Sequence, residues 1–288
     1  SLTADNTLTV EVRGKPGGAI LLSILGEDNV APSISASLSV PANTNGWHNQ
    51  DVIVSFSCND DFSGIASCTG PVTISTEAAN QIITGTTTDN AGNTVSTSVT
   101  INLDKTLPTI TASPSTPANA NGWHKQDLSV SFTCNDNGSG IASCSPPNTP
   151  STEGVGQIIS GAATDLAGNT ATASTTINLD KTAPSLSIDA PLNASVQIDN
   201  PTQIIVSYND ANGIDVNAFA LQMDGLPLSA QCTSTTSISS CIPNTNLSLG
   251  GHTLQASIGD LAGNTANNQV TFQQSSPDTD GDGVIDTD

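Results

Sequence analysis

The acidic residues near the end of the chain have the types and spacing of a calcium-binding loop. Gly283 stands at the sixth position of this run, where it permits the sharp turn that lets the chain wrap around a cation. Hard cations prefer oxygen ligands, which alternating aspartates and one main-chain carbonyl supply. The sequence therefore predicts a calcium site here, and a flexible acidic tail is the alternative. The predicted ligands are Asp278, Asp280, Asp282, the carbonyl of Val284, and Asp286.

A second acidic pattern recurs inside the chain. Asp60 and Asp104 reappear 76 residues later as Asp136 and Asp180. Asp104 and Asp180 each open an Asp-Lys-Thr-x-Pro segment, which resembles the interdomain calcium sites of cadherins and of some bacterial adhesin repeats. The four aspartates are therefore predicted calcium ligands. The alternative is that these carboxylates bind no metal.

A third set of aspartates opens the motif Asp-x-Ala-Gly-Asn, at Asp89, Asp165 and Asp260. An aspartate that opens such a turn accepts hydrogen bonds from main-chain N–H groups, and glycine supplies the positive φ that the turn requires. We therefore predict a structural role for these three residues.

The cysteines form three close pairs with spacings of ten, ten and nine residues. None has the CxxC form of a zinc or redox site, and an even number in an acidic chain favours disulfides made in an oxidising compartment. In the first two pairs the closed loop carries the aspartates Asp60 and Asp136, so the bridge is expected to hold that turn in place. The predicted bridges are Cys58–Cys68, Cys134–Cys144 and Cys232–Cys241.

Other chemistry is weakly indicated. Trp47 and Trp123 follow Asn-Gly turns and are candidates for a ligand platform on which a sugar stacks, the alternative being a ring that closes the core. The three histidines are scattered, and no nucleophile elbow, P-loop or zinc-protease motif occurs. We therefore predict that the chain is not an enzyme.

Charge narrows the possible partners. With 5 Lys plus Arg against 26 Asp plus Glu, the net charge is -21, which repels nucleic acids and anionic membranes and attracts divalent cations. No stretch of 18 or more apolar residues occurs, so no membrane insertion is expected.

The candidate residues sit in a tandem repeat that contains no insertion or deletion. Residues 31–106 recur as residues 107–182, which we call the first and second copies. Apolar residues alternate with polar ones, for example at Val52, Val54 and Phe56, and turn residues recur every eight to twelve positions. About seven strands per copy, arranged in a two-sheet sandwich, are predicted.

The repeated motifs carry a resemblance to a family. Asn-Gly-Trp, Asn-Asp-x-x-Ser-Gly-Ile-Ala, Asp-x-Ala-Gly-Asn-Thr and Asp-Lys-Thr-x-Pro together resemble the bacterial immunoglobulin-like repeats of surface proteins and adhesins. The acidic run at residues 276–288 resembles thrombospondin type 3 and dockerin-like calcium repeats. The resemblance implies an all-β chain of tandem immunoglobulin-like β-sandwich domains. The short Asp-Lys-Thr-x-Pro tethers between the copies predict that these domains form an extended rod, and residues 1–30 predict a preceding β-hairpin.

Two regions depart from the period. Residues 183–275 keep Asn209-Asp210 and the turn at Asp260, but the interval between these motifs is 50 residues instead of 29, so about 21 residues are inserted and the disulfide has moved. Residues 1–30 are predicted to form a β-hairpin, which is either the end of an upstream domain or a strand used in assembly.

These observations predict an extracellular or cell-surface structural stalk or fibre segment of a bacterial surface protein, stiffened by disulfides and calcium. Its expected partners are neighbouring copies of itself or upstream domains of the same protein. The alternative is a carbohydrate- or host-binding accessory module of a secreted protein, with a surface glycan or a host protein as the partner.

Overall fold

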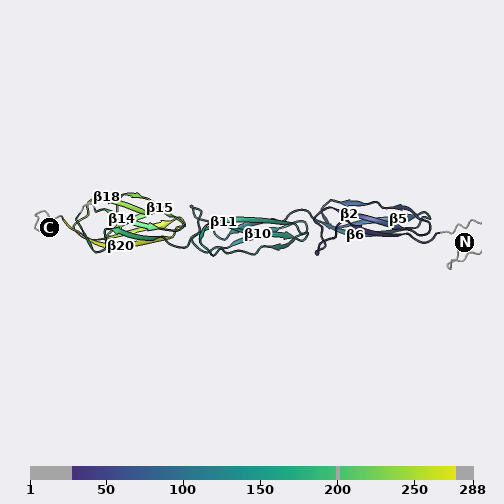
Figure 1. Cartoon of the computed structure of the whole chain (residues 1–288), viewed down its shortest axis with the longest axis horizontal. Helices are drawn as coiled ribbons and strands as arrows, with labels where there is room; N and C mark the ends of the chain where they lie inside the picture. The colour runs from purple at the N-terminus through teal and green to yellow at the C-terminus, as the bar shows by residue number, and fades with distance from the viewer. Residues whose placement is uncertain (1–27, 199–201, 277–288) are drawn as a thin grey trace, which may run out of the picture. The chain divides into compact units, whose positions relative to one another are not determined.

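The computed structural model describes residues 28–198 and 202–276, and all of its regular elements in those ranges are β-strands (Figure 1). The chain is all-β and is built of tandem immunoglobulin-like sandwiches, as predicted. The predicted hairpin at residues 1–30, apart from its last three residues, and the predicted calcium loop at residues 278–286 lie outside the described residues.

The first copy is a sandwich of two three-stranded sheets. One sheet has the order β1 (Ser33–Leu38), β2 (Val52–Asn59) and β4 (Val72–Ile74), and the other has the order β3 (Ile65–Cys68), β5 (Ala78–Asp89) and β6 (Thr94–Leu103). The predicted alternation is confirmed on β2, where Val52 and Val54 are buried and Ile53 is exposed. Ile101 and Leu103 of β6 complete the core between the sheets.

Six strands form in the first copy instead of about seven. The stretch between β1 and β2 is a turn because the side-chain Oδ1 of Asn43 accepts hydrogen bonds from the N–H groups of Asn45 (2.9 Å) and Trp47 (3.1 Å). Gly46 has a φ of 80° there, which glycine adopts without strain. His48 then makes a single bridge to Leu103.

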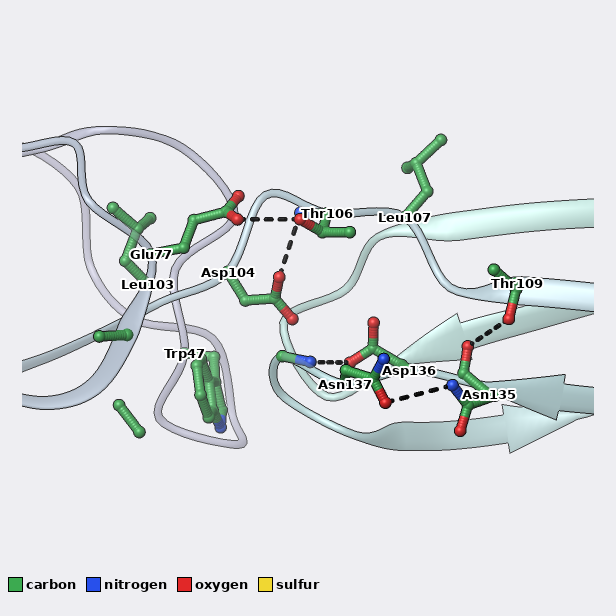
Figure 2. Close-up of a pocket in the computed structure, with 13 residues that line it drawn as sticks. Trp47, Glu77, Leu103, Asp104, Thr106, Leu107, Thr109, Asn135, Asp136 and Asn137 are labelled. Carbon is green, nitrogen blue, oxygen red and sulfur yellow. Dashed lines mark hydrogen bonds between the residues drawn. The ribbon is translucent and has the colours of Figure 1, made fainter.

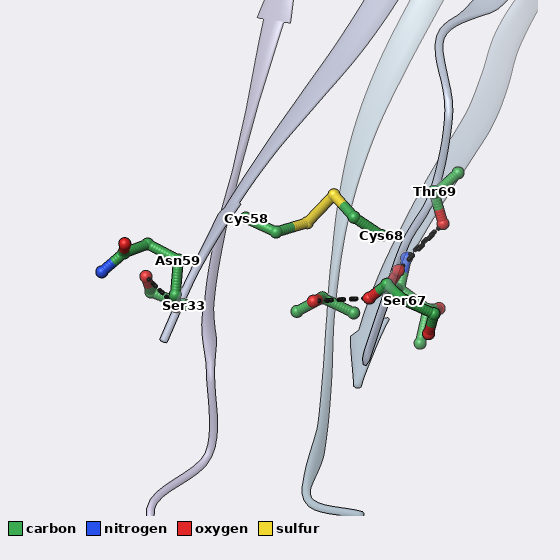
Figure 3. Close-up of a disulfide and its surroundings, with 8 residues drawn as sticks. Ser33, Cys58, Asn59, Ser67, Cys68 and Thr69 are labelled. Atoms are coloured by element: carbon green, nitrogen blue, oxygen red, sulfur yellow. Dashed lines mark hydrogen bonds between the residues drawn. A yellow bond between two sulfur atoms is a disulfide. The ribbon is translucent and has the colours of Figure 1, made fainter. Parts of the chain in front are cut away.

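The disulfide of the first copy joins the two sheets (Figure 3). Cys58 on β2 is bonded to Cys68 on β3, and the loop between them carries Asp60. The bonds Cys134–Cys144 and Cys232–Cys241 are also present, so the predicted pairing is confirmed.

The second copy repeats this arrangement with five strands. β7 (Thr109–Pro114) pairs with β8 (Val130–Asn135), and a second sheet has the order β11 (Thr170–Leu179), β10 (Gly154–Asp165) and β9 (Ile141–Cys144). Its core consists of Leu128, Val130, Ile159, Ile177 and Leu179.

Residues 183–275 form a larger sandwich. The first sheet has the order β12 (Ser185–Ala190), β14 (Ile204–Asn209), β18 (Ile238–Pro243) and β17 (Ala230–Ser234). The second has the order β13 (Ser195–Gln197), β20 (Thr265–Gln274), β19 (Gly250–Asp260), β15 (Ile214–Met223) and β16 (Leu226–Pro227). The inserted residues add strands here, and the moved disulfide joins directly paired residues of β17 and β18.

Two compact units divide the chain, and they do not follow the copies. One consists of Ser1–Ile110, Thr133–Ser145 and Ala162–Thr172, and the other of Thr111–Phe132, Pro146–Gly161 and Ala173–Asp288. The first unit therefore unites the first copy with the loops of the second copy that carry Asp136 and Asp165. Of the predicted calcium ligands at the ends of the copies, Asp104 lies inside the first unit and Asp180 inside the second.

A glycine allows the two sheets of the first copy to approach each other. A Cβ atom at Gly85 on β5 would overlap the ring of Phe56 on β2, and the pair Gly161 and Phe132 repeats this contact.

We expect Gly85→Ala to lower the free energy of unfolding by about 1–3 kcal/mol, because overpacking forces the ring of Phe56 to move. Denaturant unfolding followed by tryptophan fluorescence measures this effect. The control is Gly70→Ala, because nothing lies near a Cβ atom at Gly70; an equal loss in both variants would contradict the packing argument.

A buried histidine makes the stability of residues 183–275 depend on pH. His252 is 7% exposed, and its Nδ1 lies 2.7 Å from Asp224 Oδ2 while its Nε2 lies 2.8 Å from the Ser248 carbonyl oxygen. Burial by itself lowers the pKa of His252, but the Ser248 carbonyl and the Asp224 carboxylate together raise that pKa above its ordinary value of 6.5. A folded pKa above the unfolded one stabilises the protein below pH 6.5, and this stabilisation is lost as pH rises through the folded pKa.

We therefore expect the stability advantage of the native chain over His252→Gln to shrink as pH rises above 6.5. The near-ultraviolet circular dichroism of Tyr208, the single tyrosine of the chain, reports unfolding of this sandwich. His124→Gln, with unfolding of the second copy followed by the fluorescence of the buried Trp123, is the control, because burial lowers the pKa of His124 and gives the opposite pH dependence. An advantage that grows with pH would contradict the assignment.

Candidate functional site: acidic clusters at the domain junctions

Three clusters of three aspartates occur among the described residues, and they repeat with the sequence period. In each cluster every carboxylate offers one oxygen, and these oxygens lie within 4.8 Å of one another. One member precedes the first strand of a sandwich, one follows the second long strand in the Asn-Asp loop, and one opens the Asp-x-Ala-Gly-Asn turn. The clusters are Asp28, Asp60 and Asp89; Asp104, Asp136 and Asp165; and Asp180, Asp210 and Asp260.

The turn aspartate is held by the hydrogen bonds that its motif predicts. The main-chain N–H of Asn169 donates to Asp165 Oδ1 (2.8 Å), and the Asn169 side-chain amide donates to Asp165 Oδ2 (2.8 Å). Gly168 has a φ of 95°. The same two bonds join Asn264 to Asp260. The turn thus presents a buried carboxylate in a fixed orientation.

The loop aspartate is fixed by its own main chain. Oδ2 of Asp136 accepts hydrogen bonds from the N–H groups of Gly138 (3.1 Å) and Gly140 (2.7 Å), the first of which is drawn in Figure 2. Asp60 makes the corresponding bond with Gly64 (2.7 Å). The disulfide closes the chain around this loop in both copies.

Asp104, which directly follows β6, accepts hydrogen bonds from both its own segment and the Asp136 loop of the second copy. Its carboxylate is 1% exposed; Oδ1 accepts the N–H of Thr106 (3.1 Å), as Figure 2 shows, and Oδ2 accepts the N–H of Ser139 (2.6 Å). Ser139 belongs to the Asp136 loop, so this bond ties the end of the first copy to the second copy.

Asn169 makes a second connection at the same place. Its side-chain amide donates to the carbonyl oxygens of Asp104 (3.0 Å) and Thr106 (3.1 Å) as well as to Asp165. Asn264 repeats these bonds with the carbonyls of Asp180 (3.0 Å) and Thr182 (3.3 Å). One asparagine side chain therefore joins the turn of one domain to the segment that leaves the preceding one.

The Asn-Gly-Trp turn supplies a third connection. The side-chain amides of Asn43 (2.8 Å) and Asn45 (3.1 Å) both donate to the carbonyl oxygen of Leu166, within the Asp165 turn. Asn119 (2.9 Å) and Asn121 (3.2 Å) do the same with the carbonyl of Leu261. Sequence reasoning considered the tryptophan of this motif, whereas the structure gives its asparagines the contact with the next domain.

The lysine of the Asp-Lys-Thr segment is tied to its own copy. The Lys105 N–H donates to Glu77 Oε1 (2.6 Å), and its Nζ lies 2.8 Å from Asp51 Oδ1. The Thr106 hydroxyl donates to Glu77 Oε2 (2.8 Å; Figure 2). The corresponding bonds recur around Lys181, with Glu153 and Asp127.

The pKa values of two equivalent aspartates, Asp28 and Asp180, shift in opposite directions. Hydrogen bonding from Ser63 and from the Val30 N–H lowers the pKa of Asp28. Burial is the main effect and raises the pKa of Asp180. The Thr182 N–H opposes it, the charges of Asp210 and Asp260 raise the pKa further, and the Asn212 side chain lowers it to a smaller extent. Asp28 therefore has hydrogen bonds that stabilise its ionised form, while Asp180 is crowded by other carboxylates.

The structure brings together some of the predicted metal ligands. Asp104 lies with Asp136, but Asp180 lies with Asp210 and Asp260, and Asp60 lies with Asp28 and Asp89. Asp278, Asp280, Asp282, Val284 and Asp286 are outside the described residues.

The two tryptophans differ in exposure. Trp123 is 6% exposed, so its ring cannot stack on a sugar in this conformation. Trp47 is half-buried and lines a cavity of about 470 Å³ beside Glu77, Asp104 and Asp136 (Figure 2). Only Trp47 is accessible as a platform.

Sequence reasoning missed several members of the clusters. Asp28 stands 76 residues before Asp104, a signal that the sequence contained. Asp89, Asp165 and Asp260 were assigned only to their turns, because the turn motif does not show which carboxylates from other loops lie beside it.

The sequence matches no protein-family model, and it matches no curated protein. The structure is similar to solved structures at low sequence identity. A three-domain immunoglobulin segment of titin is 9% identical, with a TM-score of 0.48 over 86% of this chain and 100% of that one. The EC1-4 segment of PcdhgB3 is 11% identical, with a TM-score of 0.35 over 85% of this chain and 67% of that one.

An endo-beta-1,4-mannanase from Thermotoga petrophila is 12% identical, with a TM-score of 0.29 over 34% of this chain. The match spans about a fifth of the mannanase, 21% of its length. A match at this level carries no information about the activity of this chain.

Tandem immunoglobulin-like domains with three disulfides fit an extracellular structural or adhesion module. Among residues 28–198 and 202–276 no helix has the length and apolar character needed to cross a bilayer.

Proposed function

We propose that this chain is an extracellular structural segment, a stalk or fibre part of a bacterial surface protein, in which immunoglobulin-like domains act as spacers. The observation that carries this proposal is the repeated junction. The bonds made by Asn43, Asn45 and Asn169 at the first junction recur, with the same donor and acceptor atoms, at Asn119, Asn121 and Asn264. A bonding pattern kept at successive junctions suits a molecule that must hold its domains in a set orientation.

Two further observations support a structural role over catalysis. Asp136 and Asp165 in the cluster at the first junction are occupied by main-chain and asparagine donors, so they are poorly placed to act as general acids or bases. The net charge of -21 disfavours nucleic acid as a partner and favours divalent cations such as calcium as counterions. The partners we propose are neighbouring domains of the same protein or other copies of it.

The two lysines of the Asp-Lys-Thr segments allow a direct test. Trypsin cleaves after lysine, and cleavage at Lys105 or Lys181 requires the junction to open locally. We expect the native chain to resist cleavage at both positions. Asn169→Ala removes a buried donor of three hydrogen bonds, which costs about 1–3 kcal/mol and should speed cleavage at Lys105 by about 5- to 150-fold.

Each junction serves as the control for the other. Asn169→Ala should leave cleavage at Lys181 unchanged, and Asn264→Ala should speed cleavage at Lys181 and not at Lys105, with the fragments identified by mass spectrometry. If trypsin cut the native chain at Lys105 as fast as it cuts the urea-unfolded chain, the proposed ordered junction would be wrong.

A carbohydrate- or host-binding accessory module is the second candidate, and the cavity beside Trp47 favours it. Trp47 stands there beside Glu77 and Asn135, whose polar side chains can hydrogen-bond sugar hydroxyl groups. This candidate predicts a saturable change in Trp47 fluorescence on titration with soluble oligosaccharides, measured in a Trp123→Phe background. If none of the oligosaccharides changed the emission spectrum, the hypothesis that a sugar stacks on Trp47 would be excluded.

A further inference from the structure

The three acidic clusters share one plan, but the loop of the third is one residue shorter. The N–H groups of Asn90, Leu166 and Leu261 bond the carbonyls of Gly64, Gly140 and Gly213, which identifies these glycines as equivalent. From the loop aspartate to this glycine the interval is four residues in the first two clusters, from Asp60 and Asp136, and three in the third, from Asp210.

The missing residue removes a hydrogen-bond donor. In the longer loops the serine before the glycine donates its N–H to the next cluster member, from Ser63 to Asp28 Oδ2 (3.1 Å) and from Ser139 to Asp104 Oδ2 (2.6 Å). In the shorter loop Asn212 occupies this place, and its N–H turns back to Oδ1 of Asp210 (2.7 Å). Asp180 therefore lacks the main-chain donor that its counterparts have; the Asn212 side chain lies near enough to lower the pKa of Asp180 but makes no hydrogen bond with its Oδ2.

The consequence is a buried carboxylate oxygen without a hydrogen bond. Asp180 is 1% exposed, its Oδ1 accepts the N–H of Thr182 (3.1 Å), and its Oδ2 has no hydrogen-bond partner among the described residues. Asp210 and Asp260 place two more carboxylates beside it. An unpaired buried carboxylate is costly, and adjacent like charges increase that cost, so the group requires either a proton or a cation.

We propose that Asp180, Asp210 and Asp260 form a calcium site, whereas the serine N–H takes the place of the cation in the clusters at Asp28 and Asp104. This inference rests on the proposed function, because it assigns the cation to one junction of the spacer. It also changes the sequence prediction, in which Asp104 and Asp180 were equivalent candidates.

The geometry suits calcium. Two oxygens bound to one calcium ion at about 2.4 Å can be at most about 4.8 Å apart, and the three ligand oxygens lie within 4.8 Å of one another. Lys181, the cation nearest in the sequence, is held by Asp127 at 2.8 Å. Waters would complete the six to eight oxygen ligands that calcium takes.

Calorimetric titration of the full chain with calcium chloride tests the site. The variants carry Asp278→Asn, Asp280→Asn and Asp282→Asn as a common background, so that the predicted terminal loop contributes no heat. We expect one site in this background, at least tenfold weaker after Asp210→Asn and unchanged after the matched Asp136→Asn. No calcium heat, or an equal loss in both variants, would overturn the proposal.

A second variant tests the reason for the difference between the clusters. Insertion of one serine between Asn212 and Gly213 restores the longer loop and supplies an N–H for Asp180, so calcium affinity should fall at least tenfold while the Tyr208 circular dichroism stays native. Undiminished binding in a folded insertion variant would contradict the donor argument.

Trypsin separates this inference from the proposed function. If no calcium binds but Lys181 resists cleavage, the calcium site is wrong and the spacer stands. Rapid cleavage at Lys181 with and without calcium would instead contradict the spacer.

Discussion

A carboxylate removed from water at a domain boundary must be compensated, and this requirement organises the chain. Asp104 and Asp180 are both 1% exposed, and each stands where one immunoglobulin-like domain ends and the next begins. A buried charge is tolerated only when donors or a counterion surround it. The loops and turns around each aspartate are arranged to provide that compensation, and in doing so they connect the domains.

The compensation comes mainly from main-chain N–H groups and asparagine amides. The main-chain N–H groups of Thr106 and Ser139 donate hydrogen bonds to the Asp104 carboxylate, and Asn169 links the same segment to Asp165. Main-chain donors are set by backbone conformation, so the connection depends on turn geometry more than on particular side chains. That dependence explains why glycine and asparagine recur at these positions and why loss of one loop residue changes the electrostatics around Asp180.

Much of the fold follows from local sequence patterns. The alternation in β2 and the turn at Asp165 depend on neighbouring residues, so both could be predicted, and the close cysteine pairs could be assigned for the same reason. The clusters could be predicted only in part. Asp180 meets Asp210 and Asp260 across 30 and 80 residues of chain, and nothing local to any of them shows the others. The 76-residue repeat period was the one long-range signal in the sequence, and applied backwards from Asp104 it also identifies Asp28 as an equivalent position.

Each copy contains the residues that bond to the following domain as well as those that bond to the preceding one. The asparagine turn and the Asp-Lys-Thr segment belong to the side that faces the following domain, while the acidic loop and the Asp-x-Ala-Gly-Asn turn belong to the side that receives the preceding one. A duplicated copy would therefore fit between existing neighbours without any new contact having to evolve. Lineages carrying such a gene could lengthen or shorten the protein by unequal recombination, so that its length varies while the chemistry between adjoining units stays constant.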